Sequence, residues 1–342
     1  MMRVSPLLVA VMLSACARPG SIAMLGGQTM GTTYSVQYAS AEWGSASAQM
    51  QISKAIEGKL AEINQSMSTY IPSSIISQIN VSNDIQQWHA VDLHFETVLR
   101  RSREIYGDTS HAFNPAVGPL VNAWGFGPDA PEVLPDKATV EGLLKLADFD
   151  SFEFRQSPPA LRKHSAAARL DFSAIAKGYG VDALGSLLEQ RGVTDYVVEI
   201  GGEVRASGQR PDASAWRVGI AKPSEGAAGP SSIQMVIELR DAGLATSGTY
   251  RNYDIQDGKK IAHIIDPKTG YPAQNSLLSV SVIARDAMTA DAYATALMVM
   301  GLDEGLRFVE ARKDLSAYFI AMEPSGKPVE KRSSAFPAPA KD

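Results

Sequence analysis

Residues 170–180 read LDFSAIAKGYG, and residues 289–297 read TADAYATAL. Each segment places a carboxylate, Asp171 or Asp291, at or near the start of a helix that is otherwise built of small and apolar residues. Small side chains leave room at these helix starts for a ligand and for exposed backbone carbonyl groups. The two segments are therefore the first candidates for a binding site, although they lie far apart in the chain.

Asp291 and Thr295 are four residues apart, so on a helix they stand on one face, one turn above the other. A carboxylate, a hydroxyl and a nearby backbone carbonyl are hard oxygen ligands, which suit Mg²⁺ held against a phosphate. The alternative is that Asp291 only favours its helix through the dipole at the N-terminus, ahead of a buried, Ala-rich face. The spacing alone leaves both interpretations open.

The first residues are typical of a targeting segment. Arg3 precedes an apolar run, and small residues lead to Cys16, the only cysteine of the chain. A Cys at this position resembles a bacterial lipobox, in which the Cys is lipidated; the alternative is an ordinary signal peptide with a chance Cys. We expect a signal peptide over residues 1–15, lipidation of Cys16 and a lipid-anchored tether over residues 16–25.

The composition sets limits on the class of protein. The chain has 342 residues, a formal net charge of −5 and 45% hydrophobic residues, which permits one large or two small globular domains. It has no Lys/Arg-rich stripe, so nucleic acid is not an expected partner. A single cysteine excludes an intrachain disulfide.

The hydrophobic pattern predicts helices and strands that are segregated along the chain. We expect helices over 46–66, 93–106, 140–147, 173–190 (with Ser173 as N-cap), 289–300 and 304–311, and strands over 28–38, 196–200, 216–220, 233–239, 261–265, 278–284 and 315–322. Strands grouped in the second half favour an α+β fold, with mixed or antiparallel sheets and flanking helices. We expect one domain over residues 26–323 and a polar, mobile C-terminal tail over 324–342.

Several further motifs each have a functional and a structural interpretation. Gly178 and Gly180 cost a helix about 1 kcal/mol each relative to Ala, which indicates close approach of either a ligand or another backbone. Lys177 either reaches a phosphate or is solvated. His263 lies before a Pro-Gly turn, where it either exchanges a proton in a cleft or is structural.

Three loops carry weaker signals. The Gly-, Pro- and aromatic-rich segment 114–128 either offers amides and a flat apolar surface to a ring system or packs on the core through Trp124 and Phe126. The pair Ser247-Gly248 presents a hydroxyl to phosphate or forms a bulge. Asp257-Gly258 indicates a hairpin turn. There is no phosphate loop and no Gly-x-Gly-x-x-Gly fingerprint, so any nucleotide is held in another way.

Taken together, these segments resemble the ApbE family of FAD:protein FMN transferases. The resemblance spans about residues 25–322, in the expected order. It is carried by TMGT at 29–32, NPAVGPLVN at 114–122, WGFG at 124–127, LDFSA at 170–174, KGY at 177–179, GG at 201–202, TSG at 246–248, HIIDP at 263–267, TG at 269–270 and TAD at 289–291.

The resemblance implies a Mg²⁺-dependent enzyme that uses FAD. A Thr or Ser hydroxyl of an acceptor protein attacks the FMN-side phosphorus, AMP leaves, and FMN stays on the acceptor as a phosphoester. Positions matching FAD contacts are Met30, Tyr70, Ala112, Phe113, Asn114, Asp171, Lys177 and Ile265. Positions matching the Mg²⁺ site are Ala174 (through its carbonyl), Asp291 and Thr295. His263 matches a His near the reacting phosphate, and we favour His263 or Asp266 as the base.

The resemblance also implies a setting. The acceptor is expected to be a subunit of a membrane redox complex of the Nqr or Rnf type, or a periplasmic flavoprotein. The enzyme is expected on the periplasmic side of a bacterial membrane, with the inner membrane favoured. Asn114 and Thr249 stand where many members have Asp, which predicts activity with an altered FAD affinity.

Three other functions remain open from the sequence. The same site with water as acceptor gives an FAD pyrophosphatase that releases FMN and AMP. A non-catalytic lipoprotein that binds FAD predicts binding without turnover. A scaffold lipoprotein predicts no flavin binding at all.

Overall fold

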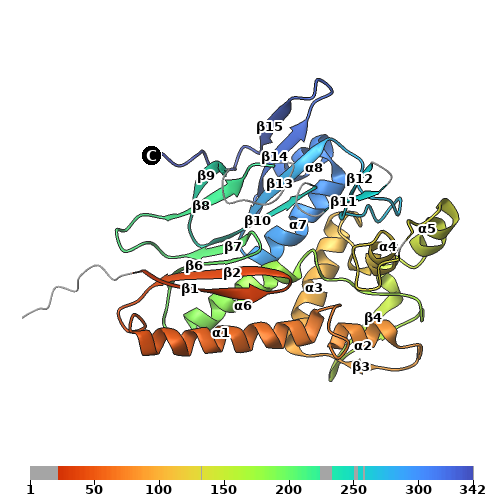
Figure 1. Cartoon of the computed structure of the whole chain (residues 1–342), viewed down its shortest axis with the longest axis horizontal. Coiled ribbons are helices and arrows are strands. Elements are labelled where there is room, and N and C mark those ends of the chain that lie inside the picture. The colour runs from red at the N-terminus through yellow and green to blue at the C-terminus, as the bar shows by residue number, and fades with distance from the viewer. Residues whose placement is uncertain (1–21, 132, 224–232, 250–252, 257–258, 342) are drawn as a thin grey trace, which may run out of the picture.

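A computed structural model of the chain describes residues 22–131, 133–223, 233–249, 253–256 and 259–341. Its main element is an antiparallel sheet of eight strands in the order β1-β2-β6-β7-β10-β13-β14-β15 (Figure 1). These strands are β1 Ile22–Thr29, β2 Thr32–Ala39, β6 Asp195–Ile200, β7 Glu203–Ser207, β10 Ala242–Gly248, β13 Leu277–Ala284, β14 Ser316–Met322 and β15 Pro328–Arg332.

Smaller sheets and helices surround this sheet. The smaller sheets pair β3 His89–Ala90, β5 Pro159–Lys163 and β4 Phe152–Gln156; β8 Trp216–Ala221 and β9 Ile233–Leu239; and β11 Tyr253–Gln256 and β12 Lys259–Ala262. The helices are α1 Ala46–Met67, α2 Ile75–Val81, α3 Leu93–Asp108, α4 Gly118–Ala123, α5 Lys137–Leu144, α6 Ala176–Glu189, α7 Ala287–Met300 and α8 Leu302–Glu310, with short 3₁₀ turns at Pro115–Val117 and Phe149–Ser151.

Alternation along the strands explains how one end of the sheet is covered. In β2 and β6 every second residue is buried, and the buried residues face each other, as in the pairs Tyr34↔Ile200 and Val36↔Val198. The apolar faces of α1 and α6 pack on this side. Helix α1 begins where the side chain of Ser45 accepts a hydrogen bond from the backbone amide of Ala48.

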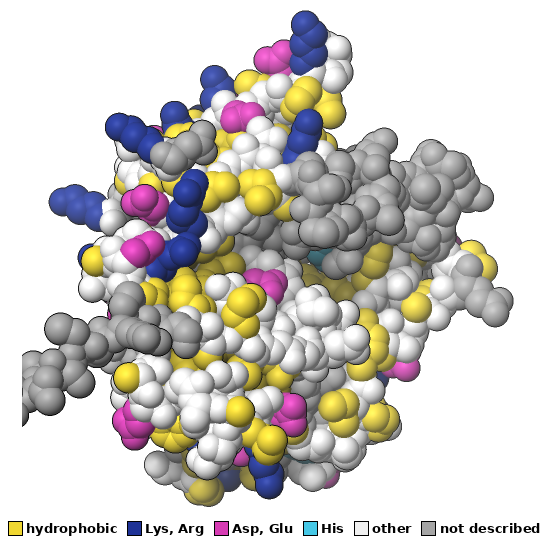
Figure 2. All heavy atoms as spheres, turned by 60° about the vertical axis from the view of Figure 1, so that its left-hand side comes forward, with side chains coloured by type: hydrophobic (Ala, Val, Ile, Leu, Met, Phe, Trp, Pro, Cys, Tyr) yellow, Lys and Arg dark blue, Asp and Glu magenta, His cyan; other side chains and the backbone are white. Residues whose placement is uncertain are grey.

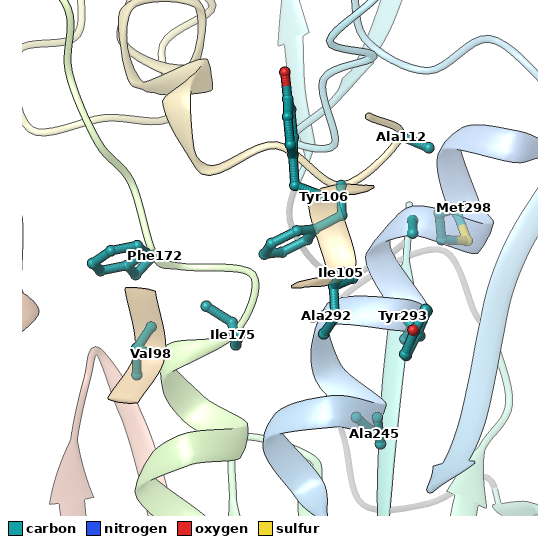
Figure 3. Packing of buried hydrophobic residues seen from close by; sticks show 14 of the residues in the cluster. Val98, Ile105, Tyr106, Ala112, Phe172, Ile175, Ala245, Ala292, Tyr293 and Met298 are labelled. Carbon is teal, nitrogen blue, oxygen red and sulfur yellow. The ribbon is translucent and has the colours of Figure 1, made fainter. Parts of the chain in front are cut away.

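The centre of the fold is α7, which is buried on almost all sides. A helix without a polar face is stable only inside the protein, and its alanines let neighbours approach closely. Figure 3 shows Ala292 and Tyr293 of α7 beside Ile105 of α3, with Ala245 of β10 nearby. Phe172 and Ile175, which precede α6, lie in the same cluster next to Val98. The segments before α6 and within α7 are thus parts of one core.

The predicted α+β class is confirmed, with antiparallel pairing throughout the main sheet. The helices predicted over 46–66, 93–106, 289–300 and 304–311 match α1, α3, α7 and α8 to within two residues at each end. The strands predicted over 196–200, 216–220, 233–239, 278–284 and 315–322 match within one residue. The helix predicted over 140–147 is found three residues earlier, as α5.

Four predictions need correction, besides the strand predicted over 28–38, which a turn at Met30-Gly31 divides into the end of β1 and β2. The tether over 16–25 is too long, because residues 22–25 already pair with β2 in strand β1. The C-terminal tail is partly ordered, because β15 pairs with β14 and the side chain of Phe336 is buried against Tyr318. The strand over 261–265 ends at Ala262, and Ile265 makes only an isolated bridge with Pro272.

The fourth correction concerns the start of α6. Ser173 is not its N-cap, because the carboxylate of Asp171 accepts hydrogen bonds from both the backbone amide (2.7 Å) and the hydroxyl of Ser173. This local turn holds residues 171–173 outside the helix, which begins at Ala176. The hairpin predicted at Asp257-Gly258 and the segment around Cys16 lie outside the described residues. Within the described residues, no helix is long and apolar enough to cross a membrane.

Candidate active site

The site is built where α6 and α7 touch. A Cβ atom on Gly178 would lie 2.3 Å from the carbonyl oxygen of Ala287 and 2.8 Å from Cβ of Asp291, so only glycine fits there. The backbone amide of Gly178 donates a hydrogen bond to Oδ2 of Asp291 at 3.0 Å. The close approach that the glycine indicated is therefore made by another backbone, and it brings the two carboxylate-bearing segments together.

Three charged groups meet at this contact. Nζ of Lys177 lies 2.7 Å from Oε1 of Glu203, and Glu203 and Asp291 are only 2% and 3% exposed. Burial raises the pKa of Glu203 to about 7, with Lys177 opposing the shift and the charge of Asp291 adding to it. Burial also raises the pKa of Asp291, against the charge of Lys177 and the hydrogen bond from Gly178. Both carboxylates are thus short of compensating positive charge.

A two-residue hairpin turn fixes Glu203 in this place. Gly201 and Gly202 have φ angles of +62° and +108°, and they join paired residues Ile200 and Glu203 of β6 and β7. The amide of Gly202 donates to Oε1 of Glu199 at 2.6 Å, which holds the turn. Glu203 therefore starts β7 with its carboxylate at the ammonium group of Lys177.

The oxygens near Asp291 fit a hard cation. Thr295 lies one turn further along α7, and its Oγ1 is 3.1 Å from Oγ of Ser247, a residue of β10 rather than of a free loop. Ala174 belongs to the turn before α6, which packs on the same core. Among the described residues no group of three or more His, Cys, Asp or Glu is placed to hold a metal. A cation here would therefore depend on Asp291, hydroxyl and carbonyl oxygens, which suit Mg²⁺.

Tyr70, Phe126 and His263 form an aromatic rim. The hydroxyl of Tyr70, whose side chain is exposed, donates to the carbonyl oxygen of Phe126 at 3.0 Å. Burial of its phenol and the nearby charge of Asp171 raise the pKa of Tyr70. The ring of Phe126 meets the ring of His263 edge to face, with centroids 6.2 Å apart. The structure thus brings the predicted residues Tyr70, Asp171 and His263 to one rim, with Phe126 between two of them.

Other residues that the sequence singled out have structural roles. Both carboxylate oxygens of Asp266 are engaged in their own turn, by the amide of Lys268 (2.8 Å) and the hydroxyl of Thr269 (3.1 Å). Asp266 therefore has a structural role in holding this turn. Ile265 is 6% exposed and packs with Trp124, whose indole N–H donates to the carbonyl of Gly270 at 2.8 Å. The aromatic-rich loop is anchored on the core through this Trp.

The segment 112–114 is buried. Ala112 and Phe113 are 3% and 2% exposed, so their backbone rather than their side chains would meet a ligand. The Asn114 side chain donates to the carbonyl of Ala147 and accepts from the amide of Ala116, both at 2.8 Å. Met30 is one of the described residues with positive φ, at +49°, and its side chain lies close to Gly180.

Sequence reasoning missed two acidic residues of this region, Glu203 and Asp182. Both lie next to residues that it singled out, since Glu203 follows Gly201-Gly202 and Asp182 follows Gly180 by two positions. Asp182, on α6, accepts hydrogen bonds from the amides of Ala287 (3.0 Å) and Met288 (2.8 Å) at the start of α7. It fixes the position of the helix that carries Asp291.

Asp182 makes the stability of the protein depend on pH in a predictable direction. Burial, assisted by the charge of Asp286, raises its pKa from 3.8 to about 6, against the two amides and Arg205. The folded chain thus keeps a proton that the unfolded chain releases near pH 3.8. The contribution of this proton to the free energy of unfolding is therefore complete below pH 3.8 and is lost as the pH rises through 6. At about 1.4 kcal/mol per pKa unit, it amounts to about 3 kcal/mol.

Urea unfolding of the protein and of Asp182→Asn from pH 4 to 6.5 measures this contribution. The free energy of unfolding of the natural protein is expected to fall relative to that of the variant across this range. A difference that stays constant with pH would contradict the assignment of the proton to Asp182.

Comparison with known structures gives the class of protein. The flavin transferase ApbE from Vibrio cholerae superposes with a TM-score of 0.82 and 37% identity, covering 93% of this chain and 99% of that one. The flavinyl transferase ApbE of Pseudomonas stutzeri, in its apo form, superposes with a TM-score of 0.82 and 32% identity, covering 92% of this chain and 96% of that one. The fold is thus that of the flavin transferases.

The sequence comparison gives the family. The family described as the ApbE family matches residues 30–319. An FAD:protein FMN transferase of Haemophilus influenzae is 37% identical, over 96% of this chain and 94% of its own length. The chain belongs to the ApbE family.

Proposed function

We propose that this protein is an FAD:protein FMN transferase that moves FMN from FAD to a Thr or Ser hydroxyl of an acceptor protein. The observation that carries the proposal is the contact of α6 with α7, which buries Asp291 beside Lys177 and Glu203. The relatives from Haemophilus influenzae and Vibrio cholerae, 37% and 39% identical over most of both chains, are FAD:protein FMN transferases.

The chain's own groups divide the reaction between them. The acceptor oxygen forms a bond to the FMN-side phosphorus, the bond from that phosphorus to the bridging oxygen breaks, and AMP leaves with this oxygen. His263, on the rim, takes the proton of the acceptor hydroxyl, since an imidazole accepts protons near neutral pH. Lys177 places a positive charge against the phosphates. The aromatic rim at Tyr70 and Phe126 offers flat surface to the flavin ring.

Mg²⁺ belongs to the same proposal. Asp291, Thr295 and the carbonyl of Ala174 would hold it; Thr295 lies one turn from Asp291 on α7, where its Oγ1 contacts Oγ of Ser247. When bound, Mg²⁺ neutralises phosphate charge and polarises the phosphorus for attack. Positions Met30, Ala112, Phe113, Asn114, Asp171 and Ile265 are proposed to contact FAD, with the buried ones acting through their backbone.

We also propose the setting of the reaction. Cys16 would be lipidated and anchor the enzyme on the periplasmic side of a bacterial membrane, with the acceptor an Nqr- or Rnf-type subunit or a periplasmic flavoprotein. On the face seen in Figure 2, acidic and basic side chains lie interspersed around hydrophobic ones. A surface of mixed charge favours recognition of the acceptor by local contacts rather than by a long-range field.

A direct assay tests the function. The protein is mixed with FAD, Mg²⁺ and a candidate acceptor domain, and the products are separated on a denaturing gel. Flavin fluorescence on the acceptor band that survives denaturation and disappears with EDTA is the expected result. His263→Gln is expected to lower the rate by a factor on the order of 10²–10⁴, the usual contribution of a general base.

Two other outcomes have specific meanings. FMN and AMP in solution without a labelled band would indicate an FAD pyrophosphatase. FAD binding with neither product, for each acceptor tried, would indicate a protein that only carries the flavin.

A further inference from the structure

Two buried carboxylates share one ammonium group in this site. Nζ of Lys177 pairs with Oε1 of Glu203, and the same positive charge acts on Asp291. Since Glu203 and Asp291 are 2% and 3% exposed, solvent does little to compensate the second negative charge. A buried charge without a partner is expensive, so this group of three is poised to take up a further cation.

The second carboxylate oxygen of Glu203 accepts no hydrogen bond from the described residues. This atom, Oε2, is buried, and within the described part of the chain it has no hydrogen-bond partner. Most buried polar atoms in proteins are paired, so an unpaired carboxylate oxygen calls for an explanation. Lys177 pairs with Oε1 at 2.7 Å and Glu203 is only 2% exposed, so Oε2 is not compensated by solvent either.

A purely supporting role does not account for this arrangement. Orienting Lys177 requires only Oε1, and a neutral Gln would supply an equivalent oxygen. The second oxygen and the cost of ionising this buried carboxyl are then unexplained, and the charge of Asp291 raises that cost further. A divalent cation at Asp291 would account for both.

We propose that Glu203 is a further residue of the cation site: its carboxylate supplies the second negative charge that draws a divalent cation to Asp291, while it holds Lys177 in position. The ligand class is a small, hard divalent cation, which prefers oxygen donors. The inference rests on the proposed function only in taking Mg²⁺ as this cation.

The test is a Mg²⁺ titration by calorimetry on the full-length protein in detergent, without FAD. Glu203→Gln is expected to weaken Mg²⁺ binding about tenfold or more, since the number of charged ligands tunes such affinities. Glu189→Gln is the matched control. Glu189 lies at the far end of α6 and also pairs with a cation, Arg205, at 2.8 Å. Its variant is expected to bind Mg²⁺ as the natural protein does.

Thermal unfolding adds a second measurement, which would not change if Glu203 only supported Lys177. Without Mg²⁺, Glu203→Gln is expected to melt no lower than the natural protein, because an uncompensated buried charge is gone. Its stabilisation by added Mg²⁺ is expected to shrink. Unchanged Mg²⁺ affinity overturns the proposal, and so does a loss of FAD affinity in EDTA with Mg²⁺ binding intact.

Lys177→Met decides the question if Glu203→Gln does not fold. This variant leaves both carboxylates without their ammonium, so Mg²⁺ alone is expected to bind more tightly than to the natural protein. Binding that is no tighter contradicts the inference. Transfer activity is scored separately: a natural protein that binds Mg²⁺ in this pattern but labels no acceptor would refute the proposed function and leave the cation site standing.

Discussion

Replacing Asp291 by Ala or Asn is expected to abolish Mg²⁺-dependent FMN transfer, with turnover reduced about a thousandfold or more. Asp291 is the carboxylate at the centre of the proposed cation site; Thr295 and Ala174 bring no charge of their own, and the Glu203 carboxylate already pairs with Lys177. A metal ion contributes several kcal/mol to the stabilisation of transferred charge, which is the size of the expected loss.

The same substitution has an opposite effect on the protein without metal. Burial raises the pKa of Asp291, so the folded chain bears a cost for the ionised form. Asn is neutral and its carbonyl can still accept the hydrogen bond from Gly178. We therefore expect Asp291→Asn to melt at or above the temperature of the natural protein in EDTA, and to show no stabilisation by Mg²⁺.

Asp286→Asn is the matched control for this prediction. Asp286 is the N-cap of the same helix, where its side chain accepts from the amide of Thr289 at 2.8 Å. Asn is as good an N-cap as Asp, so stability should change little and Mg²⁺ dependence should remain. Turnover and Mg²⁺ dependence retained in Asp291→Asn would remove the metal from this position.

The site was predictable where its parts are close in sequence. Asp291 and Thr295 are one helical turn apart on the same face. Gly178 destabilises a helix relative to Ala, so its presence after Lys177 indicates that another group approaches the helix closely there. What the sequence could not show is that Gly178 and Asp291 touch each other. That contact joins residues more than a hundred positions apart, and no local period encodes it.

Glu203 was missed for a related reason. In sequence it is an acidic residue after two glycines, which is typical of an exposed turn. It is buried because the turn points toward α6, where Lys177 covers it. The role of Glu203 follows from its contact with Lys177 and not from the residues next to it in the sequence.

The two ends of the sheet were missed because edge strands lack a clear alternating pattern. Strand β1, with the sequence IAMLGGQT, contains two adjacent glycines, and β15, PVEKR, is mostly polar. Each is an edge strand that depends on the ladder offered by its neighbour, β2 or β14. Charge and proline on an edge also discourage pairing with other molecules, so a polar composition there is compatible with a strand.

Gly178→Ala is expected to disrupt the contact of α6 with α7. The new Cβ would lie 2.3 Å from the carbonyl oxygen of Ala287, an atom of the backbone that cannot rotate away. Helices α6 and α7 would have to separate, because neither can yield locally. Overpacking a core usually costs about 1–3 kcal/mol, and we expect a loss of unfolding free energy near the upper end of this range.

The effect on function should exceed the effect on stability. Separation of the helices weakens the hydrogen bond from the amide of Gly178 to Asp291 and moves Lys177 away from α7. A displacement of about 1 Å at a reacting centre costs about a hundredfold in rate. Urea unfolding and the transfer assay, carried out on the same preparation, measure the two effects side by side.

Gly58→Ala provides the matched control, because a Cβ at Gly58 in the middle of α1 would meet no atom within 4 Å. The same change there is expected to stabilise the protein by up to about 1 kcal/mol, since Ala is the better helix former. Transfer by this variant should equal that of the natural protein. If Gly178→Ala proved as stable and as active as Gly58→Ala, the direct contact of α6 with α7 could not be what holds the site together.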